Sequence, residues 1–199
     1  MYIWGENGVL RRTDVASNMK KTILLITTIA TIGCQNQPSD NDFVTEKWSN
    51  GQPKTIELTS TVDTTLTYTI QLDSLGRLKE LTPFNNQEIE GTKLYFRDNS
   101  ELEAVLNYVD GKRDGYTYEF YPGVQRAFQG TSENGEFNGT STWYYKNAQI
   151  QETGERLDNQ KEGEWTEYYE NGQLKAKGTY TAGKKNDDWT YWTKSGEEK

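Results

Sequence analysis

The chain has 199 residues, of which 33% are hydrophobic and 13% aromatic, and its formal net charge at pH 7 is −8. It contains no histidine and one cysteine, which excludes Ser-His-Asp and Cys-His catalysis, an intrachain disulfide and the commonest zinc ligand. An acidic chain also argues against binding to nucleic-acid backbones. We therefore expect no nucleic-acid partner, no metal and no cofactor.

The N-terminal part of the chain is predicted to be an export signal. A basic Met-Lys-Lys start at Met19 is followed by the apolar run 23–32. This pattern is typical of a secretory signal, and the run is too short to cross a bilayer as a stable helix. Residues 19–33 are thus expected to form a signal-peptide helix, and residues 1–18 to be an upstream extension.

The end of this segment resembles a bacterial lipobox, with the sequence Thr31-Ile32-Gly33-Cys34. The resemblance implies that Cys34 becomes the lipidated first residue of the mature chain, and residues 34–42 would then be a polar tether. The protein would be held through its lipid at the cell envelope, in the outer membrane or at the cell surface. The alternative is that Cys34 is a buried free cysteine.

The rest of the chain shows a 24-residue repeat. The repeat is degenerate in residues 43–90 and clear in residues 91–199, and a fixed period of this size indicates a tandem-repeat architecture. Glycines follow the same spacing in three columns, Gly91 to Gly163, Gly130 to Gly178, and Gly111 to Gly183 with Asn159 in place of one glycine. The defining column is large and hydrophobic, and consists of Trp48, Leu72, Phe96, Phe120, Tyr144, Tyr168 and Trp192.

Each repeat is predicted to be one β-hairpin. In the unit 163–186, residues 164–169 and 173–180 alternate between apolar and polar side chains around Asn171-Gly172, which predicts two strands joined by a type I′ turn. A lone hairpin is marginal in water, so each unit needs its neighbours. The predicted fold is therefore all-β: an elongated antiparallel meander of tandem 24-residue β-hairpin repeats.

The best-preserved motifs are G-x-W-x-x-Y-Y at residues 163–169 and N-G-x-L-K at residues 171–175. They resemble the variant MORN repeat (membrane occupation and recognition nexus), which in bacteria is often labelled a YwqK-type antitoxin. The resemblance implies a single-layer sheet of hairpins without agreed catalytic residues. With the lipobox, it indicates a bacterial lipoprotein that carries such repeats.

The leading functional interpretation is a non-catalytic scaffold that binds a protein or a cell-surface polymer, because stacked repeats present extended surfaces. Aromatic residues near the C-terminus could form a stacking platform for a glycan or a peptide. The alternative is that the same rings pack the sheet and cover its open end. The candidate binding residues are Trp143, Trp165, Trp189, Trp192, Tyr145 and Tyr169.

Two other functional classes stay open. One is a glycan-acting enzyme that uses a carboxylate pair such as Glu164 and Glu167. The other is an antitoxin-like or assembly partner whose edge strand pairs with a strand of another protein. In the free protein, Glu197, Glu198 and Lys199 would then protect that edge.

Overall fold

The computed structural model describes residues 2–4, 10–12, 43–60 and 63–199. The chain divides into two units, Met1–Phe43 and Val44–Lys199. The described part of the first unit is a two-stranded sheet of β1 (Tyr2–Trp4) and β2 (Leu10–Arg12). The predicted signal-peptide helix and Cys34 lie outside the described residues. Within the described ranges no helix is long and apolar enough to span a membrane.

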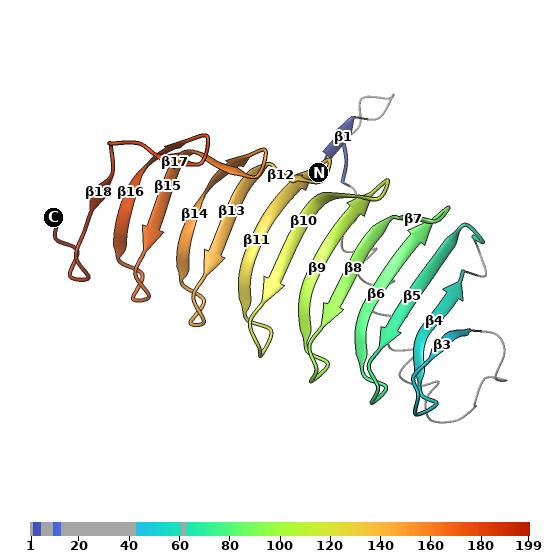
Figure 1. Cartoon of the computed structure of the whole chain (residues 1–199). Coiled ribbons are helices and arrows are strands. Elements are labelled where there is room, and N and C mark those ends of the chain that lie inside the picture. The colour runs from blue at the N-terminus through green and yellow to red at the C-terminus, as the bar shows by residue number, and fades with distance from the viewer. Residues whose placement is uncertain (1, 5–9, 13–42, 61–62) are drawn as a thin grey trace. The chain divides into compact units, whose positions relative to one another are not determined.

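The second unit is one open sheet of sixteen strands, in which nearly every strand pairs in antiparallel fashion with its neighbour in sequence. Figure 1 shows this sheet as a continuous, twisted row of hairpins. The prediction of an all-β hairpin meander is confirmed. The strands are β3 (Val44–Lys47), β4 (Pro53–Thr59), β5 (Leu66–Leu72), β6 (Leu78–Asn85), β7 (Glu88–Ile89), β8 (Gly91–Phe96), β9 (Leu102–Val109), β10 (Lys112–Phe120), β11 (Arg126–Glu133), β12 (Glu136–Phe137), β13 (Gly139–Tyr144), β14 (Ile150–Leu157), β15 (Gln160–Tyr168), β16 (Leu174–Thr181), β17 (Lys184–Lys185) and β18 (Thr190–Tyr191).

The hydrophobic column of the repeat marks the end of the first strand of each hairpin. In β15 and β16 the pairing runs regularly to Glu167 and Ala176, shifts register, and then joins Tyr168 to Leu174. The same shift occurs next to Leu72, Phe96, Phe120 and Tyr144. A bulge at one fixed place bends every strand in the same way, so the repeats stack in phase.

The hairpin turn corrects one prediction. The Tyr169 amide donates to the Gln173 carbonyl and the Gly172 amide donates to the Tyr169 carbonyl, each at 2.8 Å. Gly172 has φ 82, but Asn171 is not among the residues with positive φ. The turn is thus a longer loop with one left-handed residue, and the predicted two-residue type I′ turn at Asn171-Gly172 is wrong.

Type I′ geometry occurs instead at the opposite end of the strands, where one hairpin passes to the next. Asp110-Gly111 has φ 48 and 73, and Asn134-Gly135 has φ 53 and 98. These return turns join strands that pair directly on either side of them, such as Val109 with Lys112. Two residues with positive φ suit the twist of antiparallel strands, which explains why glycine is frequent here.

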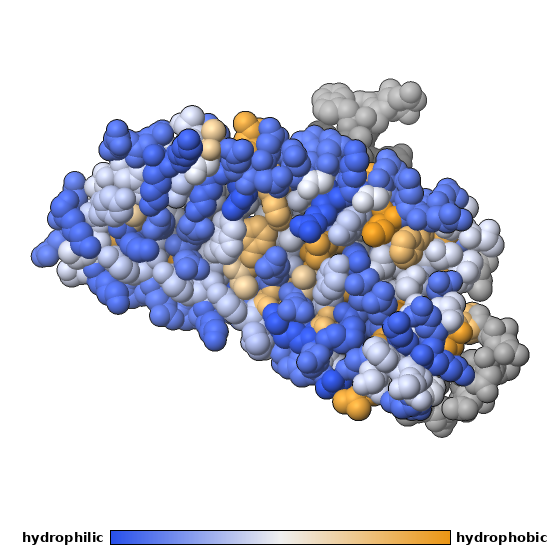
Figure 2. Space-filling view, in the orientation of Figure 1, coloured by the Kyte–Doolittle hydropathy of each residue, from blue (hydrophilic) through white to orange (hydrophobic). Residues whose placement is uncertain are grey.

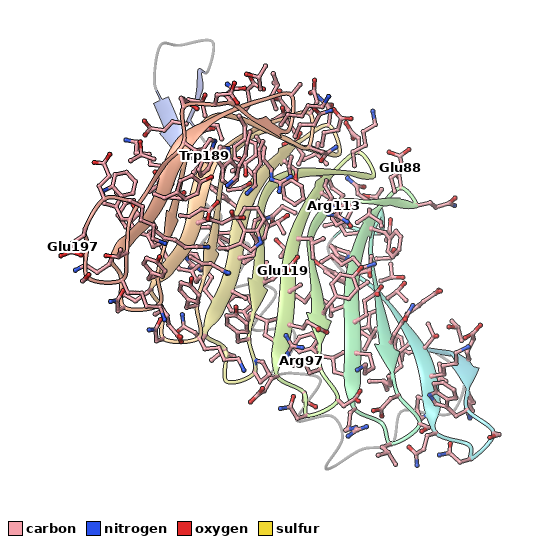
Figure 3. All side chains as sticks on the ribbon, turned by 60° about the vertical axis from the view of Figure 1, so that its left-hand side comes forward. Glu88, Arg97, Arg113, Glu119, Trp189 and Glu197 are labelled. Atoms are coloured by element: carbon pink, nitrogen blue, oxygen red, sulfur yellow. The ribbon has the colours of Figure 1, made fainter. Side chains whose placement is uncertain are left out.

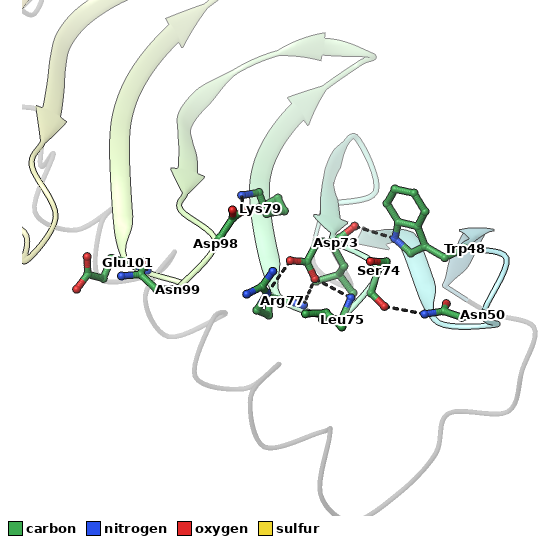
Figure 4. Close-up of polar contacts among 11 residues, drawn as sticks. Trp48, Asn50, Asp73, Ser74, Leu75, Arg77, Lys79, Asp98, Asn99 and Glu101 are labelled. Atoms are coloured by element: carbon green, nitrogen blue, oxygen red, sulfur yellow. Dashed lines mark hydrogen bonds and ion pairs between the residues drawn. The ribbon is translucent and has the colours of Figure 1, made fainter.

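A ladder of side-chain hydrogen bonds couples most repeats to the next at the hairpin-turn end. The Tyr121, Tyr145 and Tyr169 hydroxyls donate to the carbonyls of Tyr144, Tyr168 and Trp192, at 2.8–2.9 Å. Each acceptor belongs to the hydrophobic column one repeat further on. Trp48 donates in the same way to the Leu72 carbonyl at 3.1 Å (Figure 4), and Arg97 donates to the carbonyl of Phe120.

A second ladder couples the repeats at the return-turn end. The residue before each glycine of the column Gly91 to Gly163 accepts a hydrogen bond from a backbone amide of the next return turn. Glu90 accepts from Asp110, and Glu162 accepts from Ala182. Asp114 and Asn138 accept equivalent bonds from Asn134 and Asp158. Both ends of every hairpin in this series are therefore tied to the following hairpin, which is the physical basis of the period.

The hydrophobic core follows rows of cross-strand neighbours rather than filling a space between layers. One row joins Ile70, Leu81, Leu94 and Val105 across β5, β6, β8 and β9, and all four side chains are buried. They lie on one face of the sheet because directly paired residues share a face. Figure 2 shows a surface on which hydrophilic residues predominate and hydrophobic residues form separate patches.

Candidate functional site

The other face of the sheet carries a continuous row of aromatic rings. Phe128 of β11 pairs with Trp143 of β13, and their ring centroids are 4.6 Å apart. The row continues from Trp143 to Trp165 at 6.0 Å and from Trp165 to Tyr180 at 5.9 Å. Trp189 follows at 5.3 Å from Tyr180. We call the face that these rings define the ring face, and the other the opposite face.

Two of the tryptophans pack flat on glycines. A Cβ atom built on Gly154 would lie 2.4 Å from the Trp165 ring, and one on Gly178 would lie 2.5 Å from the Trp189 ring. The indole of Trp165 donates to the Glu155 carbonyl at 3.0 Å, and the Trp189 indole donates to the Thr179 carbonyl at 3.0 Å. The absence of a side chain at Gly154 and Gly178 therefore makes room for a ring.

Lysines cover the outer side of these rings. The Lys161 ammonium lies 4.0 Å from the Trp165 ring centroid, and the Lys185 ammonium lies 3.6 Å from that of Trp189. These are close cation–π contacts. Lys161 also pairs with Glu152 at 2.6 Å. The two tryptophans thus have a glycine below them and a lysine above them, so little of either ring face is free for a ligand.

Glu167 holds the second lysine in place. Its carboxylate pairs with Lys185 at 3.1 Å and with Lys175 at 3.2 Å. Partial burial acts to raise the pKa of Glu167, but the hydrogen bonds from both lysines outweigh it, and the pKa lies below its ordinary value. Partial burial likewise acts to lower the pKa of Lys185, and the contact with Glu167 outweighs it, so this pKa is raised.

The six predicted binding residues do not form one platform. Trp143, Trp165 and Trp189 lie on the ring face, and Trp165 is fully buried. Trp192 follows Tyr191, which pairs with Ala176 on the ring face, so the alternation of a strand turns Trp192 to the opposite face. Figure 3 shows Trp189 towards the C-terminal end of the sheet.

The remaining two, Tyr145 and Tyr169, lie at the hairpin turns, where their hydroxyls form the ladder described above. The structure favours the packing interpretation for these residues.

The carboxylates considered for catalysis are not brought together. Trp165 pairs with Gly178 on the ring face, so Glu164 points to the opposite face and Glu167 to the ring face. Glu164 pairs with Lys177 at 2.9 Å, whereas Glu167 contacts the two lysines named above. Among the residues that the structure describes, no group of three or more acidic, cysteine or histidine side chains could hold a metal ion.

A pocket of about 460 Å³ lies where the aromatic row gives way to smaller and charged residues. Tyr95, Ala104 and Glu119 line it from three neighbouring strands, and Figure 3 shows Glu119 near the middle of the sheet. Arg97 and Glu103 form an ion pair of 2.8 Å in its wall. Sequence reasoning missed these residues, although the columns of the repeat show that small alanines replace long side chains here.

Solved structures similar to this chain share little of their sequence or length with it. The Glycosylation Associate Protein (Gap123) complex from Streptococcus agalactiae is 21% identical over 59% of this chain and 21% of the other, with a TM-score of 0.36. TarM is 13% identical over 70% of this chain and 25% of its own, with a TM-score of 0.34. The chain thus spans about a quarter or less of these proteins.

Sequence comparison adds one match. No curated protein matches the chain. Residues 161–182 match the MORN repeat variant. This stretch contains most of the hairpin formed by β15 and β16, together with Lys161, Trp165 and Glu167. The match therefore supports a MORN-type repeat in the hairpin of β15 and β16, which contains Trp165 of the aromatic row.

Proposed function

We propose that this chain is a lipid-anchored repeat protein of the cell envelope whose sheet binds a partner protein and catalyses no reaction. The observation that carries the proposal is the double hydrogen-bond ladder. It fixes successive hairpins in phase, through bonds such as Tyr145 to Tyr168 and Glu162 to Ala182. A sheet built in this way offers an extended surface in which each repeat adds a fixed set of side chains.

A protein partner is favoured over a glycan stacked on the tryptophans. Stacking requires a free ring face, but Trp165 lies between Gly154 and Lys161, and Trp189 between Gly178 and Lys185. The separation of Glu164 and Glu167 on opposite faces likewise supports a non-catalytic role.

The anchor is proposed from the lipobox resemblance at Cys34, and labelling tests it separately. Cells that express the full chain are grown with an alkyne fatty acid, and we expect the label on the wild-type chain but not on a Cys34→Ser variant. An unlabelled wild-type chain recovered in the soluble fraction would contradict the anchor and leave the binding proposal intact.

The binding proposal is tested by photo-crosslinking in the native envelope. A crosslinking amino acid replaces Tyr191, which is 45% exposed on the ring face, or Ile150, which is 37% exposed on the opposite face. One protein crosslinked in stoichiometric amount from one of the two positions supports a specific protein interface. Recovery of glycan alone, or of the same mixture of proteins from both positions, would contradict it.

A further inference from the structure

The pocket on the ring face contains a carboxylate without a partner. Glu119 belongs to β10 and lines the pocket next to Ala104 and Ala127. Within the described part of the chain its carboxylate makes no hydrogen bond and no ion pair. The nearby Arg97 contacts Glu103 and the Phe120 carbonyl through its two terminal nitrogens, while its buried Nε has no hydrogen-bond partner among the described residues. The pocket therefore has one negative charge that its own cation does not balance.

The repeat itself shows what this carboxylate contacts elsewhere. Glu167 lies exactly two repeats after Glu119, and so takes the same position in its hairpin. There the chain provides two lysines, Lys175 at 3.2 Å and Lys185 at 3.1 Å. The same carboxylate in the same strand position is thus a lysine-binding group in one repeat and unpaired in the other.

Both lysines are missing from the earlier repeat. The residue two repeats before Lys175 is Ala127, and the residue two repeats before Lys185 is Phe137. Ala127 lines the pocket, so part of the pocket is the space that a lysine side chain takes up beside Glu167. The two repeats thus differ at this position, where alanine stands in the earlier repeat and lysine in the later one.

We propose that this pocket accepts a lysine side chain of a partner protein, in the place that Lys175 takes in the later repeat. The inference rests on the proposed function and names the chemistry that the partner must present. The ammonium group would meet the Glu119 carboxylate, and the methylene groups would lie against Tyr95, Ala104 and Tyr121 in the pocket wall. A lysine stem suits such a wall because its methylene groups are apolar while its head is charged.

The volume and charge of the pocket agree with this ligand. The pocket of about 460 Å³ is open to solvent on one side, so a side chain of a partner could enter it from outside. Glu119 is exposed to solvent, so a lysine can pair with it at the surface, whereas a neutral or anionic group gains no such contact. A lysine balances the charge, as Lys175 and Lys185 do for Glu167.

The test uses peptides, so its result does not depend on finding the native partner. The full chain labelled with ¹⁵N is titrated with the peptide Ac-Gly-Ser-Lys-Ser-Gly-amide, with the same peptide carrying norleucine for lysine, and with ethanolamine. We expect the lysine peptide to shift the amide resonances of Ala104, Glu119 and Ala127. The norleucine peptide should bind about two- to fivefold more weakly, because it lacks the charge that pairs with the exposed carboxylate.

Two variants and one control locate the binding. Glu119→Gln removes the charge, and Ala127→Lys fills the pocket with a lysine of the chain itself. We expect Glu119→Gln to weaken binding of the lysine peptide about two- to fivefold, as for an exposed ion pair, and Ala127→Lys to weaken it at least as much. Glu133→Gln makes the same charge change at an exposed position outside the pocket and should leave binding unchanged.

Equal binding of the lysine and norleucine peptides, or full binding by Ala127→Lys, would overturn the inference. Equal binding of ethanolamine would also overturn it, because the pocket would then recognise any small amine. None of these results bears on the crosslinking experiment, which tests whether a protein partner exists. A crosslinked partner combined with a failed titration would reject the lysine pocket alone.

Discussion

At the scale of single residues, the contact between Gly154 and Trp165 sets the tightest limit on the sequence. A Cβ atom on Gly154 would lie 2.4 Å from the indole ring, a distance that forces the ring to move. Trp165 is fully buried and its indole is bonded to Glu155, so movement is costly. We predict that Gly154→Ala lowers the free energy of unfolding by about 1–3 kcal/mol, measured by urea denaturation.

A double-mutant cycle separates this contact from a general preference for glycine. Once the ring is removed by Trp165→Ala, the added methyl group has no indole to meet, and Gly154→Ala should cost little. Equal costs in both backgrounds would show that the contact does not determine the effect.

A second prediction concerns the left-handed residue of the hairpin turn. Ala148 has φ 69 at the position that Gly172 fills with φ 82 one repeat later. A left-handed backbone costs an alanine roughly 1–2 kcal/mol relative to a glycine. Part of the stability gained by the change to glycine is lost again, because glycine has the greater chain entropy in the unfolded state. We expect Ala148→Gly to stabilise the protein by about 0.5–1 kcal/mol. Gly172→Ala should destabilise it by a similar amount, and thermal melts that show the same sign for both would contradict the argument.

The sequence alone predicted the period and the hairpins, because both follow from spacing and alternation. It could not separate the roles of the glycines. Gly111 and Gly172 adopt positive φ, whereas Gly154 does not and is required by a ring from the next strand. Such a contact depends on cross-strand register, which the bulge next to Glu155 changes, and a bulge leaves no mark in the spacing of the repeat.

At the scale of the hairpin, the tyrosine ladder should contribute one hydrogen bond for each repeat. The Tyr145 hydroxyl donates to the Tyr168 carbonyl at 2.8 Å in a partly buried setting. Tyr145→Phe removes the donor and leaves that carbonyl without this partner, so we predict a loss of about 0.5–1.5 kcal/mol in urea denaturation. Tyr191→Phe is the matched control, since that hydroxyl makes no hydrogen bond to the described residues. An equal loss in both variants would count against the ladder.

The ion pairs between hairpins predict a pH dependence. The pKa of Glu167 is lowered on folding, so its contribution to stability is present above the unfolded pKa of about 4.3 and is lost as the pH falls through the folded value. The pKa of Lys185 is raised, so its contribution is present below about pH 10.4 and is lost as the pH rises through the folded value. Between these limits the pair contributes fully.

The Lys185→Met variant tests this dependence because it retains a long side chain above Trp189 but removes the charge. We expect the stability difference between wild type and variant to be constant from about pH 6 to 9, and to shrink below about pH 4 as Glu167 is protonated. Urea denaturation over this range measures it. A difference that stays the same at pH 3 would mean that the charge of Glu167 has no part in it.

At the scale of the whole sheet, the two ladders imply that repeats can be removed only in whole units. Deleting residues 163–186 removes one complete period and joins Glu162 to Asp187, which keeps every column in phase. Trp189 would then cover Gly154 as Trp165 does now, and Lys161 would lie above it. Tyr145 would donate to the Trp192 carbonyl, as Tyr169 does in the intact chain. We therefore expect the C-terminal segment to dock on β14.

Deleting residues 163–185 instead leaves Asn186 in place, so the segment that follows is one position out of phase. Because strand side chains alternate, this shift turns Trp189 away from the ring face and withdraws it from Gly154. Hydrogen exchange at the Trp192 amide, which donates to the Lys175 carbonyl in the intact chain, distinguishes the two outcomes. The amide should be protected by the Gln151 carbonyl in the whole-period deletion and unprotected in the shorter one. Equal protection in both would mean that the sheet tolerates a slip, and that the ladders do not set its register.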